Sequence, residues 1–89
     1  MDYESIIHAI VDPFVNDKEA IMIREMPSEN PKDVLLLIVA NSDDTARMIG
    51  RKGTIADSLR ELISVAGKTE NKRIHLKFES FTVENKDED

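Results

Sequence analysis

The sequence contains no cysteine and no tryptophan, and it has only three glycines, three phenylalanines and one tyrosine. Without cysteine there is no disulfide framework, no thiolate nucleophile and no cysteine-ligated zinc. Few aromatic rings are available for the stacking surfaces by which RRM and OB folds bind bases. Neither a Gly-x-Gly-x-x-Gly motif nor a P-loop motif is present, so nothing supports a nucleotide cofactor. We expect no metal and no cofactor.

Long apolar runs are also absent. The longest, residues 34–40, is seven residues long, whereas a membrane-spanning helix needs about 20. The first residues are acidic where a signal peptide would be basic. These features predict a cytoplasmic protein without membrane insertion. The chain has 89 residues, of which 40% are hydrophobic, which suits one small folded domain.

The titratable side chains form no catalytic constellation in the sequence. We expect His8 and His75 to be surface residues and assign neither of them as a base or a metal ligand. Asp43 and Asp44 could hold Mg²⁺, but helix capping explains them more simply. We therefore expect no enzymatic activity.

Hydrophobic periodicity predicts the element order α-β-β-α-α-β. Residues 34–40 are apolar on both faces, as expected of a central strand. Residues 84–89 form an acidic tail that we expect to be disordered, so the predicted domain spans 1–83. The first predicted element is a helix whose apolar face runs from Tyr3 to Phe14 and which Asp12-Pro13 keeps from continuing. The others are strands over 20–26 and 34–40, a short helix ending at 49, a helix over 55–66 closed by Gly67, and a strand from 73 that ends or bulges near Ser80.

Charge is distributed unevenly along the chain. Residues 45–78 carry eight basic and three acidic side chains, whereas the remainder carries four basic and fifteen acidic ones, for a net charge of −6. An acidic body with one basic segment is compatible with a single anion-binding face. Four basic residues of this segment are more simply interpreted as solvated surface: Arg60, Lys68, Lys72 and Arg73.

The most informative motif is Gly50-Arg51-Lys52-Gly53, which lies between the two predicted helices. Two glycines three residues apart allow a tight turn and a close approach to the main chain. The first amide groups of the following helix have no intrahelical partners and carry a partial positive charge. Together with Arg51 and Lys52, this arrangement suits a phosphate backbone.

Residues 34–81 resemble the βααβ core of a KH domain, with Ile49-Gly50-Arg51-Lys52-Gly53 in the position of the family's I-G-x-x-G loop. The preceding helix and strand resemble the type II arrangement of bacterial KH domains. The size and the Asp12-Pro13-Phe14 helix end are most similar to the small stand-alone proteins of the KhpA (YlqC-like) family. The resemblance implies an α+β fold, a single type II KH-like domain whose three-stranded sheet has its helices packed on one face.

The resemblance further implies binding of single-stranded RNA in a narrow groove for about four nucleotides. By position, Arg51 and Lys52 would face the phosphates, while Ile49 and Ile55 would line an apolar floor under the bases. Many KH sequences have a large aliphatic residue where this chain has Ala56. The predicted RNA-binding residues are Ile49, Gly50, Arg51, Lys52, Gly53, Thr54 and Ile55.

Self-association is also implied, as is pairing with a larger KH protein of the KhpB (Jag) type, in a bacterial RNA chaperone or post-transcriptional regulator linked to cell elongation and division. In the sequence itself, the apolar arc of the helix over 55–66 is wider than a helix on a three-stranded sheet needs. Ile63 and Val65 are therefore candidates either for the core or for a dimer interface. The alternative function is a protein-interaction module in which RNA binding is secondary.

Overall fold

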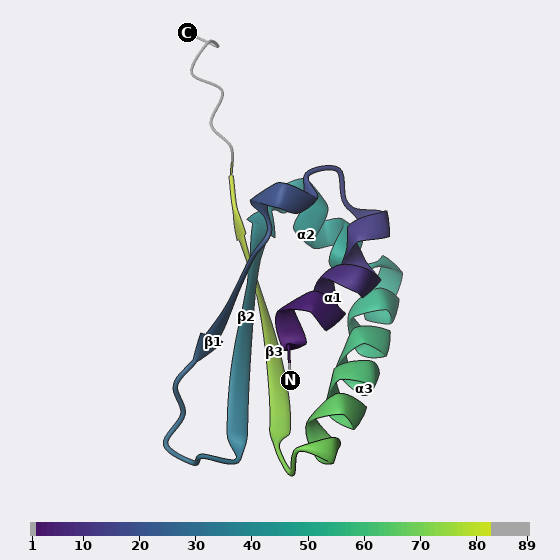
Figure 1. Cartoon of the computed structure of the whole chain (residues 1–89). Helices are drawn as coiled ribbons and strands as arrows, with labels where there is room; N and C mark the ends of the chain where they lie inside the picture. The colour runs from purple at the N-terminus through teal and green to yellow at the C-terminus, as the bar shows by residue number, and fades with distance from the viewer. Residues whose placement is uncertain (1, 83–89) are drawn as a thin grey trace, which may run out of the picture.

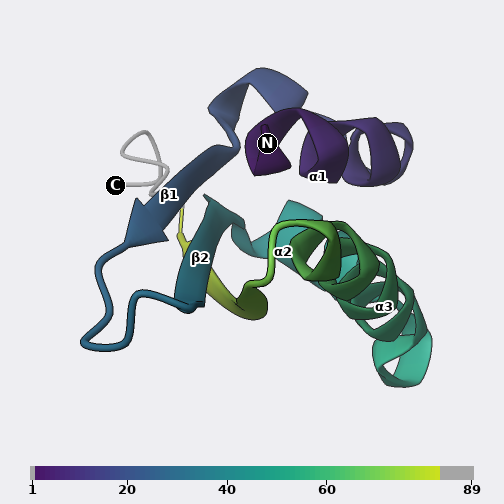
Figure 2. The same ribbon diagram turned by 60° about the horizontal axis from the view of Figure 1, so that its bottom comes forward.

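Three helices pack on one side of a three-stranded sheet in the computed structural model, which describes residues 2–82 (Figure 1). Viewed from one end, the helices all lie on the same side of the strands (Figure 2). The predicted α+β fold and element order are confirmed, and the predicted acidic tail lies outside the described residues. The elements are α1 (Tyr3–Val11), β1 (Met22–Met26), β2 (Asp33–Asn41), α2 (Ser42–Ile49), α3 (Thr54–Thr69) and β3 (Arg73–Phe81), with 3₁₀ turns at Asp12–Phe14, Lys18–Ala20 and Arg51–Gly53.

The strands are ordered β1-β2-β3, with β1 antiparallel and β3 parallel to the central β2. A parallel pair requires a crossover connection, which α2 and α3 supply. The β2–β3 register is unbroken from Asp33 opposite Arg73 to Asn41 opposite Phe81. The strand ends at Phe81, so the predicted end near Ser80 is confirmed, and the alternative of a bulge is not. Because side chains alternate along a strand, Phe81 falls on the face of the sheet away from the helices.

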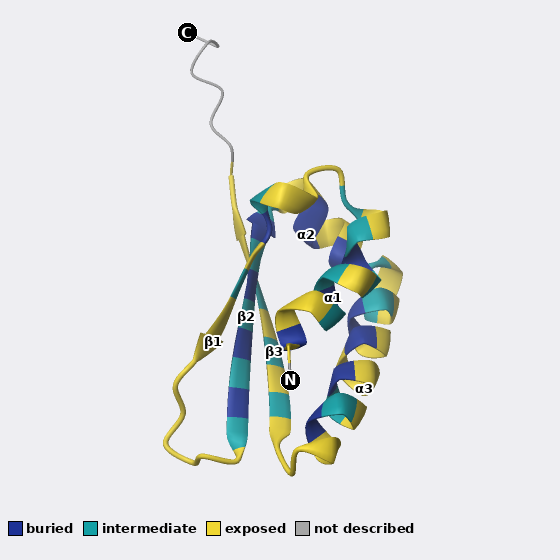
Figure 3. Cartoon of the chain, viewed as in Figure 1, coloured by how far each residue is buried: buried dark blue, intermediate teal, exposed yellow. Residues whose placement is uncertain are grey.

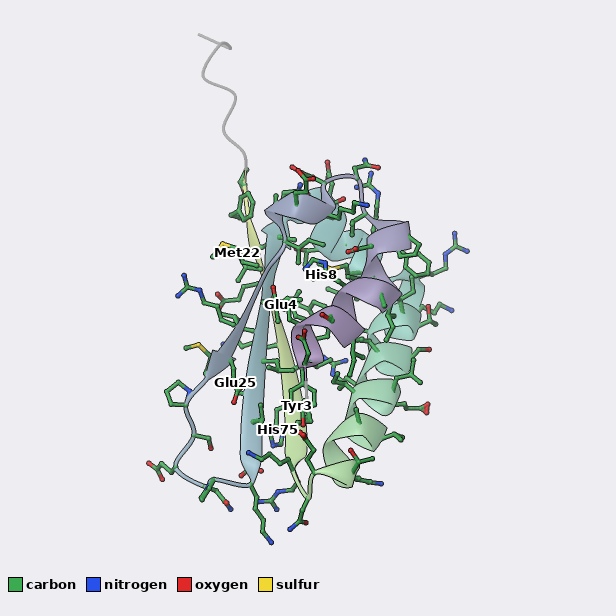
Figure 4. The ribbon with its side chains drawn as sticks, in the orientation of Figure 1. Tyr3, Glu4, His8, Met22, Glu25 and His75 are labelled. Carbon is green, nitrogen blue, oxygen red and sulfur yellow. The ribbon has the colours of Figure 1, made fainter. Side chains whose placement is uncertain are left out.

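The hydrophobic core lies between the sheet and the helices. Alternate residues of β2 point into it, and the intervening ones are only half-buried on the opposite face (Figure 3). Both faces of β2 are apolar, but within residues 2–82 the helices cover only one of them. Met22 of β1 lies on this open face (Figure 4) and is 46% exposed. The buried β2 residues are Val34, Leu36, Ile38 and Ala40.

Helix α1 stops where Asp12-Pro13 predicts, before the end of its apolar face at Phe14. It ends at Val11 and continues as a 3₁₀ turn through Pro13, which has no N–H to donate. Phe14 at the end of that turn is exposed rather than part of the core. At the other end of α1, the buried Tyr3 donates its hydroxyl to Glu70 Oε1 at 2.6 Å (Figure 4). Burial and this hydrogen bond raise the pKa of Tyr3 to about 12.

Helix α3 is rotated by about one residue from the predicted orientation. Its buried stripe is Ala56, Leu59, Ile63 and Gly67. Ile63 is fully buried, so the core interpretation holds and its place in a dimer interface is wrong. Leu62, predicted to be in the core stripe, is 53% exposed.

Gly67 is the last residue of this buried stripe and packs closely against β3. A Cβ at this position would lie 2.5 Å from Ile74 Cγ1 and 2.9 Å from the Lys72 carbonyl oxygen, so glycine lets α3 approach β3 closely. Gly67 is therefore a packing residue within the helix and not its cap. The turn that leaves α3 uses Asn71, whose φ is 60°, and the Lys72 amide donates back to the Gly67 carbonyl.

Asp44 joins α2 to the loop that precedes β1. Its side chain is 1% exposed and accepts hydrogen bonds from the Asn16 amide at 2.9 Å, the Asp17 amide at 3.0 Å and Arg47 Nη1 at 2.8 Å. These bonds, that from Asn16 above all, outweigh burial and hold the pKa of Asp44 below its usual value. Asn41 caps α2 by accepting from the Asp44 amide, as predicted for this segment.

We expect Asp44→Asn to lower the free energy of unfolding by about 2–3 kcal/mol at pH 7, because amide donors would be left without a carboxylate acceptor. The folded-state pKa of Asp44 is lowered, so its contribution is complete above the unfolded-state value of about 3.9 and is lost as the pH falls through the folded value. Urea unfolding between neutral and acidic pH measures both effects.

The matched control is Asp43→Asn, which changes an exposed neighbour and should cost less than about 1 kcal/mol. Equal losses in the two variants, or an unchanged acid profile in Asp44→Asn, would contradict the role assigned to Asp44.

Candidate nucleic-acid interface

The turn between α2 and α3 is held by main-chain hydrogen bonds. The Gly50 amide donates to the Ala46 carbonyl at 3.0 Å and so ends α2. The Gly53 amide donates to the Gly50 carbonyl at 3.1 Å, and the Thr54 amide donates to the Arg51 carbonyl. The result is a compact loop that passes directly into the first turn of α3.

Three of the four loop residues have positive φ: 78° at Gly50, 57° at Lys52 and 78° at Gly53. The two glycines meet different requirements. A Cβ on Gly50 would lie 2.8 Å from Ile55 Cγ1, whereas a Cβ on Gly53 would meet nothing within 4 Å. Gly50 therefore allows close packing against Ile55, and Gly53 leaves open space above the backbone at the start of α3.

Lys52 is the unusual member of the loop. A side chain in the left-handed region costs roughly 1–2 kcal/mol relative to the right-handed one. Such strain tends to occur at functional positions, where the surrounding structure holds it in place. Here the adjoining glycines and their hydrogen bonds hold Lys52 in this conformation.

The loop is cationic and has no acidic partner within the described part of the chain. Arg51 and Lys52 are exposed, and neither makes an ion pair among residues 2–82. Arg47, by contrast, is bound to Asp44. No side chain caps the start of α3, so its partial positive charge adds to that of the loop. This end of the domain is therefore suited to an anion.

Ile49 and Ile55, the predicted floor of the groove, are half-buried on the two sides of the loop, and Thr54 is exposed. The structure thus brings all seven predicted residues to one turn. It also adds a pair that sequence reasoning missed, because the Arg60 guanidinium lies 5.8 Å from the ring centre of Phe78 on β3. These residues are 18 positions apart, and only the packing of α3 on β3 brings them together.

Strand β3 lies at the edge of the sheet. One side of its backbone consequently has N–H and C=O groups without a neighbouring strand. Helix α3 packs on this edge strand.

Comparison with known proteins places this fold and loop in a family. The sequence model described as the KhpA/KhpB KH domain matches residues 4–78, which include the loop. The chain belongs to the KhpA/KhpB family of KH domains. None of the helices within residues 2–82 of this KH domain is long and apolar enough to cross a bilayer.

Curated relatives agree with this assignment. The KH domain is 32% identical over 73 residues to a protein of Listeria monocytogenes named RNA-binding protein KhpA, and the match covers 82% of this chain and 93% of that protein. It is 30% identical over 73 residues to the RNA-binding protein KhpA of Oceanobacillus iheyensis, covering 82% and 95% respectively. No solved structure gives a significant match.

The two loop glycines should differ in their tolerance of alanine. We expect Gly50→Ala to lower the free energy of unfolding by about 2–4 kcal/mol, because it adds a clash with Ile55 to the strain of positive φ. Gly53→Ala should cost only about 1–2 kcal/mol, because it adds strain alone. Urea unfolding of the two variants measures the difference, and equal losses would contradict the packing role of Gly50.

Proposed function

We propose that this KH domain binds single-stranded RNA through the Gly50–Gly53 loop and has no catalytic activity of its own. The observation that carries the proposal is the loop itself, where exposed Arg51 and Lys52 adjoin the uncapped start of α3 with no acidic partner among the described residues. The names of the curated relatives support it.

In this mechanism the loop captures the phosphates and the neighbouring apolar surface receives the bases. Arg51 and Lys52 supply the charge, and the open space at Gly53 admits a phosphate close to the main chain. Ile49 and Ile55 then lie under the bases, and the free edge of β3 offers hydrogen-bond partners for base edges. Such a groove holds about four nucleotides.

The small loop limits how many phosphates are neutralised. With two or three phosphate contacts, a plot of the logarithm of the binding constant against the logarithm of the salt concentration should have a slope of roughly −1.5 to −2 for a single strand. Affinity from one such groove should be on the order of micromolar. Two linked grooves on one RNA would gain by effective concentration, so self-association would be useful to this protein.

We propose that α3 provides the self-association surface. Val65, predicted as an interface residue, is 61% exposed, and Leu62 one turn earlier is 53% exposed. The two lie three residues apart and so share a helix face. A second KH domain could cover this face, either another copy or a KhpB (Jag)-type partner. Both would suit an RNA chaperone or post-transcriptional regulator linked to cell elongation and division.

The alternative function is a protein-interaction module in which RNA binding is secondary. The exposed Leu62 and Val65 are the observation in its favour. The Gly50–Gly53 loop argues against this alternative, because a protein interface formed by Leu62 and Val65 would not require a strained lysine at position 52.

We expect Arg51→Asp/Lys52→Asp to weaken binding of a short labelled single-stranded RNA at least tenfold, because repulsion replaces phosphate attraction. Fluorescence anisotropy at two salt concentrations measures affinity and slope, and circular dichroism checks the fold. The charge-matched control is Lys18→Asp/Arg24→Asp, at exposed positions away from the loop. Equal affinity of wild type and the loop variant would show that the RNA does not bind at this loop.

Lys52→Gly separates the loop's charge from its conformation. It removes one cation while relieving left-handed strain, so the variant should fold at least as stably as wild type. Its RNA binding should nevertheless weaken, and its salt slope should become shallower by about 0.7.

For self-association, we expect Val65→Glu to shift the protein toward monomer in sedimentation velocity, because it places a charge in an apolar contact. Ala9→Glu, at an exposed position of α1, is the control and should leave the distribution unchanged. A wild-type protein that stays monomeric at high concentration would contradict self-association through α3.

A further inference from the structure

A basic hollow lies at the end of α3 opposite the loop. Its volume is about 490 Å³, and it forms where the turn before β2, the end of α3 and the start of β3 meet. The main-chain amides of its wall are used internally: that of Lys72 donates to Gly67 and that of Arg73 to Lys32. The lining residues are Asn30, Lys32, Lys68, Asn71, Lys72 and Arg73.

The lining therefore contains four cations and no carboxylate, in a chain whose net charge is −6. Of these cations, Arg73 pairs with Asp33 at 2.7 Å, and Lys72 is close enough to Glu70 to act electrostatically on its carboxylate. Lys68 in the last turn of α3 also complements the helix dipole. That explanation does not extend to Lys32, which comes from another part of the chain.

Helix α3 connects this hollow to the loop. Its 16 residues span about 24 Å, so the hollow and the loop lie at opposite ends of one helix. Between the two ends, Arg60, Ser64 and Lys68 recur every four residues and so follow one helix face. Arg60 lies over Phe78 of β3, which places this face on the side of α3 next to the strand.

We propose that the basic hollow is a second phosphate-binding site for RNA, engaged by strands too long for the groove at the loop. The proposal rests on RNA binding at the Gly50–Gly53 loop. A strand that leaves the loop along α3 meets Arg60 and then the cations of the hollow. The domain therefore has two phosphate contacts at opposite ends of one helix.

The composition of the hollow favours RNA over an acidic protein. Its lining has no apolar side chain, whereas protein interfaces depend on buried apolar or aromatic anchors. Lysine ammonium groups act as point charges toward phosphates, and the two asparagines add neutral hydrogen-bond donors. The hollow is open enough for a flexible backbone to lie across it.

The test compares two RNA lengths. Labelled single strands of about four nucleotides and about twelve nucleotides are titrated with wild type and Lys68→Glu/Lys72→Glu by fluorescence anisotropy. The short strand should bind both proteins equally within about twofold, whereas the long strand should bind the variant about tenfold more weakly. Its salt slope should also become shallower by about 1.4, the equivalent of two phosphates.

Lys18→Glu/Arg24→Glu is the control for net charge, since it makes the same change at exposed positions elsewhere. Lys68→Gln/Lys72→Gln repeats the test if the charge reversals disturb the end of α3. The proposal would be overturned if Lys68→Glu/Lys72→Glu weakened the binding of both RNA lengths equally, or if the control variant weakened the binding of the long RNA as much. Neither result would contradict RNA binding at the loop. A glutamate-rich peptide is titrated in parallel. If Lys68→Glu/Lys72→Glu lost binding of this peptide but kept binding of the long RNA, the proposal would also be overturned, in favour of a protein partner.

If wild type binds neither strand, or binds the short one independently of Arg51 and Lys52, the proposed function fails and the second site fails with it. The short-strand measurement thus distinguishes failure at the loop from failure at the hollow.

Discussion

The parallel pairing of β2 with β3 determines where everything else in this domain can lie. A chain that leaves β2 must return to the opposite end of the sheet before it can enter β3. Here α2 and α3 make that return, and the Gly50–Gly53 loop is the corner between them. The other end of the crossover is fixed by the close contact of Gly67 with Ile74. The candidate site is therefore a consequence of the sheet's topology and needs no additional structural element.

Sequence reasoning predicted the order of the elements and the loop, because both depend on short-range signals. Hydrophobic period identifies a helix or a strand, and two glycines at the junction of two helices identify a tight turn. The rotation of α3 was missed because it depends on a tertiary contact. Leu62 and Ile63 are both good core residues, and Ile63 is the buried one because it shares a helix face with Gly67, which packs closely on β3.

Polar contacts between distant residues were beyond the reach of sequence patterns for the same reason. The segment 41–44 has more capping side chains than one helix start needs. This excess was the one sign in the sequence that one of them makes a different contact. Nothing in the sequence says that Asp44 binds amides 27 and 28 positions away. Likewise, Lys32 and Lys68 look like isolated surface lysines until the fold brings them to one hollow. The seven predicted RNA-binding residues are contiguous, so the sequence alone places them at one turn, and their role in binding stays a prediction.

The left-handed conformation at Lys52 and Gly53 has a consequence for recognition that concerns entropy. A loop that must become ordered on binding loses roughly 1–2 kcal/mol of conformational freedom per residue at that moment. In this domain the loop is already ordered by its own hydrogen bonds, so the loss occurs during folding. Under the proposed function, the strain lowers the stability of the fold and leaves the loop preorganised before RNA arrives. A weakly bound strand would then need few contacts to be held, and it would also be released quickly.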